Sequence, residues 1–190
     1  MASQIDHKIL VIGGSAGSFD VVNNCIHAIP ANYPHTIIFV IHRRKTKNNS
    51  IVEIMSSRSK IKVIEPEMED TIHNNTIYFA PADYHLLVNA SNCFVLDYFE
   101  TVNHSRPSID VTMKSFALQY KDRLIGILLS GASNDGALGL KMIQELGGVG
   151  LVQKPDTCEI PVMPKSAIDL FDVDYVMEPD LLIRFISELE

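Results

Sequence analysis

The sequence predicts an α/β fold, a doubly wound and mostly parallel sheet with helices on both faces. Short runs rich in β-branched and apolar residues, such as 8–12 and 36–41, are typical of strands buried on both faces. Segments with apolar residues at helical spacing, such as 18–29, alternate with these runs. The length of 190 residues fits one domain, so we expect residues 1–190 to form a single unit.

The first third of the chain has an alternating order. Strands are expected at 8–12, 36–41 and 61–64, with helices at 18–29 and near 51–55 and a polar loop at 43–49. This βαβαβ order implies right-handed crossovers between parallel strands.

The middle of the chain changes character. Residues 76–80, 84–89 and 93–99 are short β-rich runs with no room for helices between them. We therefore expect an antiparallel hairpin insert around residues 76–99.

The last part returns to alternation. Pro107 is expected as the first residue of a helix that ends at Tyr120. The elements expected after it are a strand at 123–129, a helix at 134–146, a strand at 149–153, a short helix near 165–170, a strand at 174–177 and a helix at 180–190.

Composition excludes several classes of protein. The formal charge of −7 argues against broad nucleic-acid or membrane-surface binding. No apolar run reaches the ~20 residues of a membrane helix, and residues 1–8 show no signal peptide. The three cysteines are far apart and lack CxxC spacing, so neither a zinc site nor a disulfide framework is indicated. A cytoplasmic protein without membrane insertion is expected.

Three polar residues follow expected strand ends. Ser15 lies in a glycine-rich turn after the first strand, His42 follows the second, and Asp135 follows the strand at 123–129. Ligands of open α/β sheets collect at the carboxyl ends of the strands. A hydroxyl, an imidazole and a carboxylate on one edge of the sheet are the groups of a catalytic triad, in which a base activates the nucleophile and a carboxylate orients the base.

Each of these residues also has a simpler interpretation. Ser15 could belong to a phosphate-binding turn or cap the next helix, although Phe19 breaks the GxGxxG spacing and no P-loop lysine follows. His42 could be an ordinary loop residue. Asp135 could cap the helix that follows it.

Six sequence blocks, in order, give a more specific signal. They lie at 11–17 (VIGGSAG), 40–42 (VIH), 77–85 (with Pro81 and His85), 106–110 (RPSID), 129–136 (LSGASNDG) and 163–167 (MPKSA). This series resembles the catalytic domain of the chemotaxis protein-glutamate methylesterase family, CheB, over about residues 8–188.

The resemblance implies a serine hydrolase that demethylates glutamyl methyl esters of chemoreceptors and deamidates certain glutamines. It assigns the nucleophile to Ser15, the base to His42 and the orienting carboxylate to Asp135. Backbone N–H groups near Ala16, and in the loop of Ala132, Ser133 and Asn134, would hold the oxyanion. No metal or organic cofactor is implied.

The surroundings of the triad depart from the family pattern. Ala16 stands where the family usually has Thr, and Arg43 and Arg44 follow the base in place of Met-Pro. The expected substrate rim comprises Arg43, Arg44, His85 and Met163. Arg43, Arg44, Lys45 and Lys47 could steer an acidic receptor segment to the site, or simply form a solvated loop.

The implied partners are helices of methyl-accepting chemoreceptor-like proteins. Family members usually carry an N-terminal phosphoacceptor receiver domain, whereas at most seven residues precede the first strand here. A stand-alone enzyme, an excised domain, or one regulated by a separate phosphoacceptor protein would each fit. Two other functions stay open: a nucleotide-binding module built on the 13–17 turn, and an inactive receptor-binding scaffold.

Overall fold

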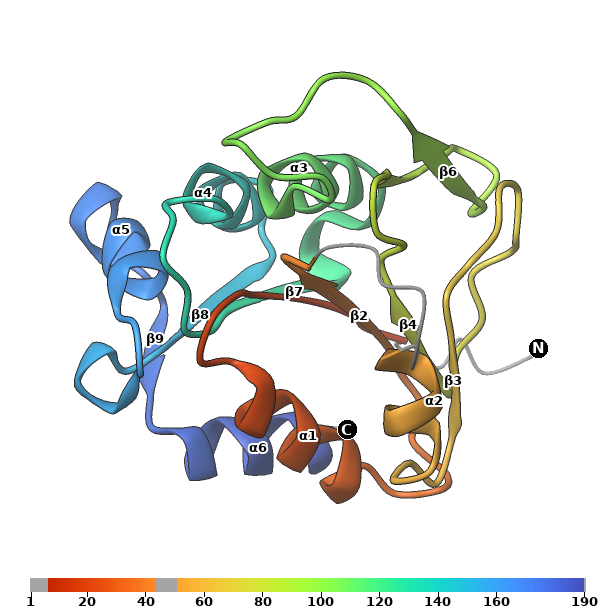
Figure 1. Ribbon diagram of the computed structural model, residues 1–190, viewed down its shortest axis with the longest axis horizontal. Coiled ribbons are helices and arrows are strands. Elements are labelled where there is room, and N and C mark those ends of the chain that lie inside the picture. Colours follow the sequence, from red (N-terminus) through yellow and green to blue (C-terminus); the bar gives the residue numbers. More distant parts are fainter. Residues whose placement is uncertain (1–6, 44–50, 190) are drawn as a thin grey trace.

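A computed structural model describes residues 7–43 and 51–189 of the chain (Figure 1). Its described residues form a seven-stranded parallel sheet in the order β3-β4-β2-β1-β7-β8-β9. In chain order these strands are β1 (Ile9–Gly14), β2 (Thr36–Ile41), β3 (Lys62–Ile64), β4 (Thr76–Phe79), β7 (Leu124–Leu128), β8 (Val149–Gln153) and β9 (Tyr175–Met177).

Helices cover both faces of this sheet, which confirms the predicted doubly wound α/β class (Figure 1). One face carries α3 (Ile109–Tyr120), α4 (Ala137–Glu145) and α5 (Val162–Leu170), and the other carries α1 (Phe19–Ala28), α2 (Ile51–Ser56) and α6 (Pro179–Ser187). Two short 3₁₀ turns, Lys121–Arg123 and Pro155–Thr157, precede β7 and follow β8. None of the helices in the described part of the chain has the length and apolar character to cross a bilayer.

The alternation of side chains along β1 explains the two layers. Ile9 and Val11 pack in the core under α3 and α4, whereas Leu10 and Ile12 pack in the second core under α1 and α6. All four are almost fully buried. Because both faces of such a strand are buried, its sequence is a continuous apolar run, and this is the pattern from which the strand is predicted.

The predicted antiparallel insert is smaller than expected. β4 pairs in parallel with both β2 and β3, so the expectation of an antiparallel strand at 76–80 is wrong. The hairpin is expected from the short spacing of the runs 76–80, 84–89 and 93–99, but the first of these runs is the last strand of a parallel crossover in which residues 65–75 join β3 to β4 without a helix. The antiparallel pair itself comprises β5 (His85–Val88) and β6 (Phe94–Asp97), which lies over α3.

Several helix starts also differ from the expected ones. α3 begins at Ile109, because the Ser108 side chain accepts the N–H of Val111 as the cap, and not at Pro107. α4 begins at Ala137, three residues later than expected, after Gly136 in the left-handed region. α5 begins at Val162, earlier than expected, and includes Pro164 in its first turn.

Candidate active site

The centre of the sheet brings the three predicted strand ends together. β1 lies between β2 and β7, and backbone hydrogen bonds on both sides of β1 continue beyond the last residues of these strands. The N–H of His42 donates to the carbonyl of Gly14 across 3.0 Å, and the N–H of Ser15 donates to the carbonyl of Ser130 across 2.9 Å. Ser15 is thus flanked by His42 on one side and by the loop that carries Asp135 on the other.

His42 and Asp135 form a buried pair. His42 Nε2 lies 2.8 Å from Asp135 Oδ2, with side chains 11% and 0% exposed. An ionised carboxylate can only accept hydrogen bonds, so Nε2 carries the hydrogen and donates it to Asp135. In the neutral ring, Nδ1 is then the nitrogen with a free lone pair, and it is the atom that can act as a base.

Asp135 is fixed by the start of α3. Its carboxylate accepts the N–H groups of Ile109 at 2.7 Å and Asp110 at 3.1 Å, and the Ser108 hydroxyl at 2.9 Å. Asp135 therefore does not cap α4, the helix that follows it, but accepts hydrogen bonds from the N-terminus of α3, where a helix favours negative charge.

The hydrogen bonds determine the ionisation of Asp135. Burial alone would raise the pKa of this carboxyl, but hydrogen bonds from His42, Asn103 and the N–H groups of Ile109 and Asp110 outweigh it and hold the pKa below its usual value. Asp135 is thus an anion at neutral pH, as an orienting carboxylate must be.

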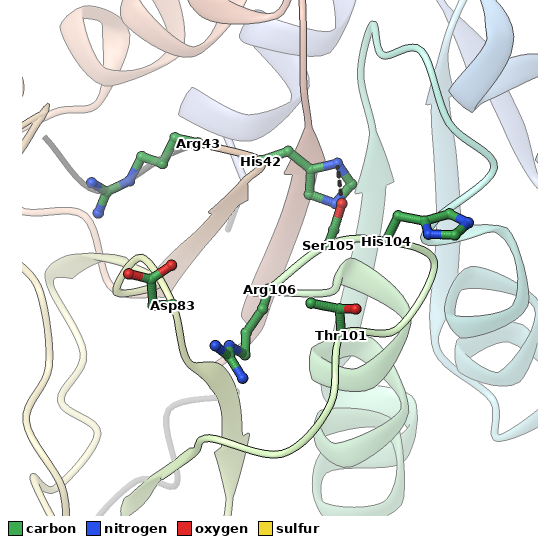
Figure 2. A pocket seen from close by; sticks show the side chains of 7 residues that line it. All are labelled: His42, Arg43, Asp83, Thr101, His104, Ser105 and Arg106. Carbon is green, nitrogen blue, oxygen red and sulfur yellow. Dashed lines mark hydrogen bonds between the residues drawn. The ribbon is translucent and has the colours of Figure 1, made fainter.

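The second nitrogen of the His42 ring faces a residue that sequence reasoning missed. Ser105 Oγ lies 3.3 Å from Nδ1 and, with Nε2 bound to Asp135, donates to it (Figure 2). Among the described residues, no hydrogen bond joins the Ser15 side chain to His42, so their contact stays a prediction. Asn103 and Ser108, both bound to Asp135, were also missed, because no local pattern marks them.

The turn after β1 gives Ser15 a suitable backbone. The carbonyl of Ser15 accepts both the N–H and the hydroxyl of Ser18, which close the turn before α1. Gly17 has a φ of +78°, which favours glycine. In the described part of the chain, no acceptor takes the N–H groups of Ala16, Ala132 or Ser133, so these predicted donors are available to an oxyanion.

Gly131 lets two parts of the site approach each other. A Cβ at this position would stand 2.6 Å from Met163 Cε, so that Met163 would have to move, and in tight contact with Ser15 Cβ at 3.1 Å. Met163 is fully buried, so it packs beneath the Ser15 turn and is not exposed on the rim as expected.

His85 also lies below the rim. It is buried, with Nδ1 accepting the N–H of Ser108 at 3.1 Å and Nε2 donating to the carbonyl of Glu100 at 3.0 Å. Its place in the structure is a support for the start of α3, not the overhanging position expected from the sequence.

A pocket of about 560 Å³ opens beside the His42 ring (Figure 2). Arg43 forms an ion pair with Glu65 and donates to the carbonyl of Ala80 at 3.3 Å. Arg106 donates to two backbone carbonyls, and its guanidinium lies 3.9 Å from the centre of the Tyr98 ring. The residues that line the pocket are His42, Arg43, Asp83, Thr101, His104, Ser105 and Arg106.

Two further observations bear on the sequence expectations. The basic residues Arg44, Lys45 and Lys47 lie outside the described residues. Within 7–43 and 51–189, no group of three or more potential ligands among His, Cys, Asp and Glu is placed to hold a metal ion.

Comparisons with known proteins agree on one family. The model of the family described as CheB methylesterase matches residues 10–186. A putative protein-glutamate methylesterase/protein-glutamine glutaminase of Leptospira interrogans is 37% identical over 186 residues, which are 98% of this chain and 96% of that protein. A protein-glutamate methylesterase/protein-glutamine glutaminase of Thermotoga maritima is 32% identical over 189 residues, covering 96% of this chain but 55% of the relative.

A solved structure extends the likeness to three dimensions. The crystal structure of the Thermotoga maritima CheB methylesterase catalytic domain matches with a TM-score of 0.91 and 32% identity, over 97% of this chain and 99% of that one. These comparisons support neither the nucleotide-binding module nor the inactive scaffold.

Proposed function

The chain belongs to the CheB methylesterase family, and on that premise we propose that it hydrolyses glutamyl methyl esters of chemoreceptor-like proteins with Ser15 as nucleophile. The observation that carries this proposal is the buried pair of His42 and Asp135, held beside the Ser15 turn at the carboxyl ends of β2, β1 and β7. A base oriented by a carboxylate next to a serine in a turn with free N–H groups is the arrangement that acyl transfer requires.

The first step forms an acyl-enzyme. Ser15 Oγ attacks the ester carbonyl while its proton passes to Nδ1 of His42, and Asp135 stabilises the imidazolium that forms. The reacting Ser15 displaces the Ser105 hydroxyl, whose 3.3 Å hydrogen bond to Nδ1 is long for an O–H donor.

The second step releases the products. The N–H of Ala16, with those of Ala132 or Ser133, stabilises the negative oxygen of the tetrahedral intermediate. Methanol leaves with the proton from His42, and water then hydrolyses the acyl-enzyme with His42 as base. A glutamine side chain passes through the same acyl-enzyme with ammonia as the leaving group, in line with the glutaminase activity in the relatives' names.

The substrates we propose are helical segments of methyl-accepting chemoreceptor-like proteins, and a separate phosphoacceptor protein is a candidate regulator. The pocket beside His42 would take the side chain that carries the ester. The reaction would take place in the cytoplasm.

The test is methanol release from a methylated receptor fragment, together with labelling by a fluorophosphonate. The wild type should release methanol and become labelled, and Ser15→Ala should do neither. Ser187→Ala, at the end of α6, serves as the matched control and should behave like the wild type. A folded Ser15→Ala variant with wild-type turnover would refute the nucleophile.

A further inference from the structure

A two-residue turn outside the predicted triad contacts both of its buried members. Val102 and Ser105 pair through reciprocal backbone hydrogen bonds of 3.2 and 3.0 Å. The residues between them, Asn103 and His104, have φ angles of +51° and +60°, as a type I′ turn requires. The turn lies just before α3, whose first N–H groups hold Asp135.

The side chain of Asn103 joins two carboxylates. Its Nδ2 donates to Asp135 Oδ1 and to Asp110 Oδ2, both at 3.0 Å. Two residues later, Ser105 reaches Nδ1 of His42. A single turn therefore touches the carboxylate at one end of the imidazole and the nitrogen at the other.

We propose that Asn103 is a positioning residue of the active site, whose amide ties Asp110 to Asp135 so that Asp135 keeps its orientation toward His42. The proposal rests on the proposed function, in which His42 and Asp135 act as base and orienting group.

The repulsion between the two carboxylates explains why a bridge is needed. Asp110 is 2% exposed and Asp135 is 0% exposed, and both accept hydrogen bonds from α3 or its neighbours. Burial raises the pKa of Asp110, and the charge of Asp135 adds to this effect. Without the shared donor, the repulsion is relieved by turning Asp135 away from His42 or by protonating Asp110.

Other charged or titratable groups also lie near these two carboxylates. Lys114 on α3 acts on Asp110 from the same helix, and the N–H of Gly139 on α4 donates to its Oδ1 at 2.6 Å. Asp169 lines a second hollow together with Asn103 and Asp110, and His85 accepts the N–H of Ser108 beside Asp135. Four further charged or titratable side chains line the pocket beside His42: Arg43, Asp83, His104 and Arg106. Asn103 is the described side chain that contacts both carboxylates.

The left-handed backbone at Asn103 permits a clean variant. Asn103→Gly keeps a residue that tolerates a φ of +51° and removes the CH₂–CONH₂ side chain, with its bridging amide. Asn75→Gly is the matched control, because Asn75 has a φ of +52° and is exposed. It precedes β4 and so lies at the amino edge of the sheet, opposite the site.

The experiment combines kinetics with a readout that needs no substrate. Asn103→Gly should lower kcat for methyl ester hydrolysis about 10-fold, the scale set by the loss of one hydrogen bond to a charged group, with KM nearly unchanged. The ¹⁵N shifts of the His42 ring should show mainly the Nε2–H tautomer in the wild type and a mixture in Asn103→Gly. Asn75→Gly should match the wild type in both measurements.

The mechanism of the bridge has its own test. In Asp110→Asn the repulsion between the two side chains is absent. The factor by which Asn103→Gly lowers kcat should therefore be less than half as large in this background as in the wild-type background. Three outcomes would overturn the bridging role. The first is an equal factor for Asn103→Gly in both backgrounds, and the second is a wild-type kcat and tautomer balance in Asn103→Gly. The third is a loss of kcat in Asn75→Gly equal to that in Asn103→Gly. If the wild type releases no methanol, the tautomer measurement still decides the inference, while the proposed function fails separately.

Discussion

His42 donates its Nε2–H to Oδ2 of Asp135 across 2.8 Å and thereby joins the end of β2 to the loop after β7. This bond fixes which nitrogen of the ring can act as a base, because the carboxylate can only accept. Nδ1, the remaining nitrogen, faces the hydroxyl of Ser105. Two serines, Ser15 and Ser105, are therefore candidates to deliver a proton to the same atom.

Replacement of each serine separates the two. Ser15→Ala should lower kcat by several orders of magnitude, on the scale known for loss of a nucleophile, whereas Ser105→Ala should change it less than about threefold. The reason is the position in the fold: Ser15 lies beside the loop of Ala132 and Ser133, whose N–H groups have no acceptor among the described residues, whereas the backbone of Ser105 closes a turn with Val102. Methanol release under single-turnover conditions measures both.

Circular dichroism should show both variants folded, since Ser15 follows the end of β1 and Ser105 lies in the turn before α3, and neither side chain is part of the hydrophobic core. Complete loss of activity in Ser105→Ala, with activity retained in Ser15→Ala, would make Ser105 the nucleophile.

Asp135→Asn should lower kcat on the order of 10⁴-fold, the scale known for such a change in a serine protease triad. An amide that turns its NH₂ toward His42 cannot accept the Nε2–H, so the ring loses the tautomer with a free Nδ1 lone pair. The ratio of kcat in variant and wild type, at a pH where His42 is neutral, is the measurement. Asp174→Asn is a suitable control, because this carboxylate accepts hydrogen bonds from Gly150 and Gln144, at the β8–β9 edge of the sheet. A variant of Asp135 that remains within tenfold of the wild type would contradict the orienting role.

Much of the fold could be predicted because its strands are buried on both faces. The runs at 36–41 and 149–153 match β2 and β8 in their bounds, since short runs that are mostly apolar and contain β-branched residues favour buried strands. The strand at 76–80 lies where it is predicted, as β4, but its antiparallel orientation is wrong, because residues 65–75 join the parallel neighbours β3 and β4 without the helix that usually marks such a crossover.

The site could be predicted only in part, for a physical reason. Strand-end logic finds residues that follow consecutive strands, such as His42 and Asp135, because the sheet geometry brings them to one edge. Asn103 and Ser105 act from a loop, and their contacts depend on the turn geometry and on where α3 starts. No periodicity in the sequence encodes such long-range hydrogen bonds.

Arg43 offers a test of electrostatic attraction. Because Glu65 pairs with Arg43, Glu65→Gln should release this positive charge beside the pocket and lower the KM for an acidic receptor fragment about two- to threefold at low salt. The difference in KM between Glu65→Gln and the wild type should become smaller as ionic strength rises, because exposed charges are screened over ~8–10 Å. Glu67→Gln changes the net charge equally at an exposed position and should leave KM closer to that of the wild type. Identical KM values for the two variants would assign the effect to net charge alone.

Tyr33 should contribute to the loss of stability in alkali. This side chain is buried and donates its hydroxyl to the carbonyl of Ile186 at 2.9 Å. Burial, with a smaller contribution from Cys25, raises the pKa of Tyr33 above its usual value of 10.0. Above pH ~10 the unfolded chain therefore releases this proton while the folded protein keeps it, so the free energy of unfolding falls by about 1.4 kcal/mol for each pH unit from this group.

Tyr33→Phe removes that dependence and should show two opposite effects. At pH 7 the variant should be less stable by about 1 kcal/mol, because the hydrogen bond to Ile186 is lost. Above pH ~10 its free energy of unfolding should fall less steeply than that of the wild type, so the two curves converge. Urea titrations between pH 7 and 11 measure both effects. Tyr175→Phe, at a half-exposed position in β9, should keep the wild-type slope, and an equal slope in Tyr33→Phe would show that Tyr33 does not titrate differently in the folded and unfolded states.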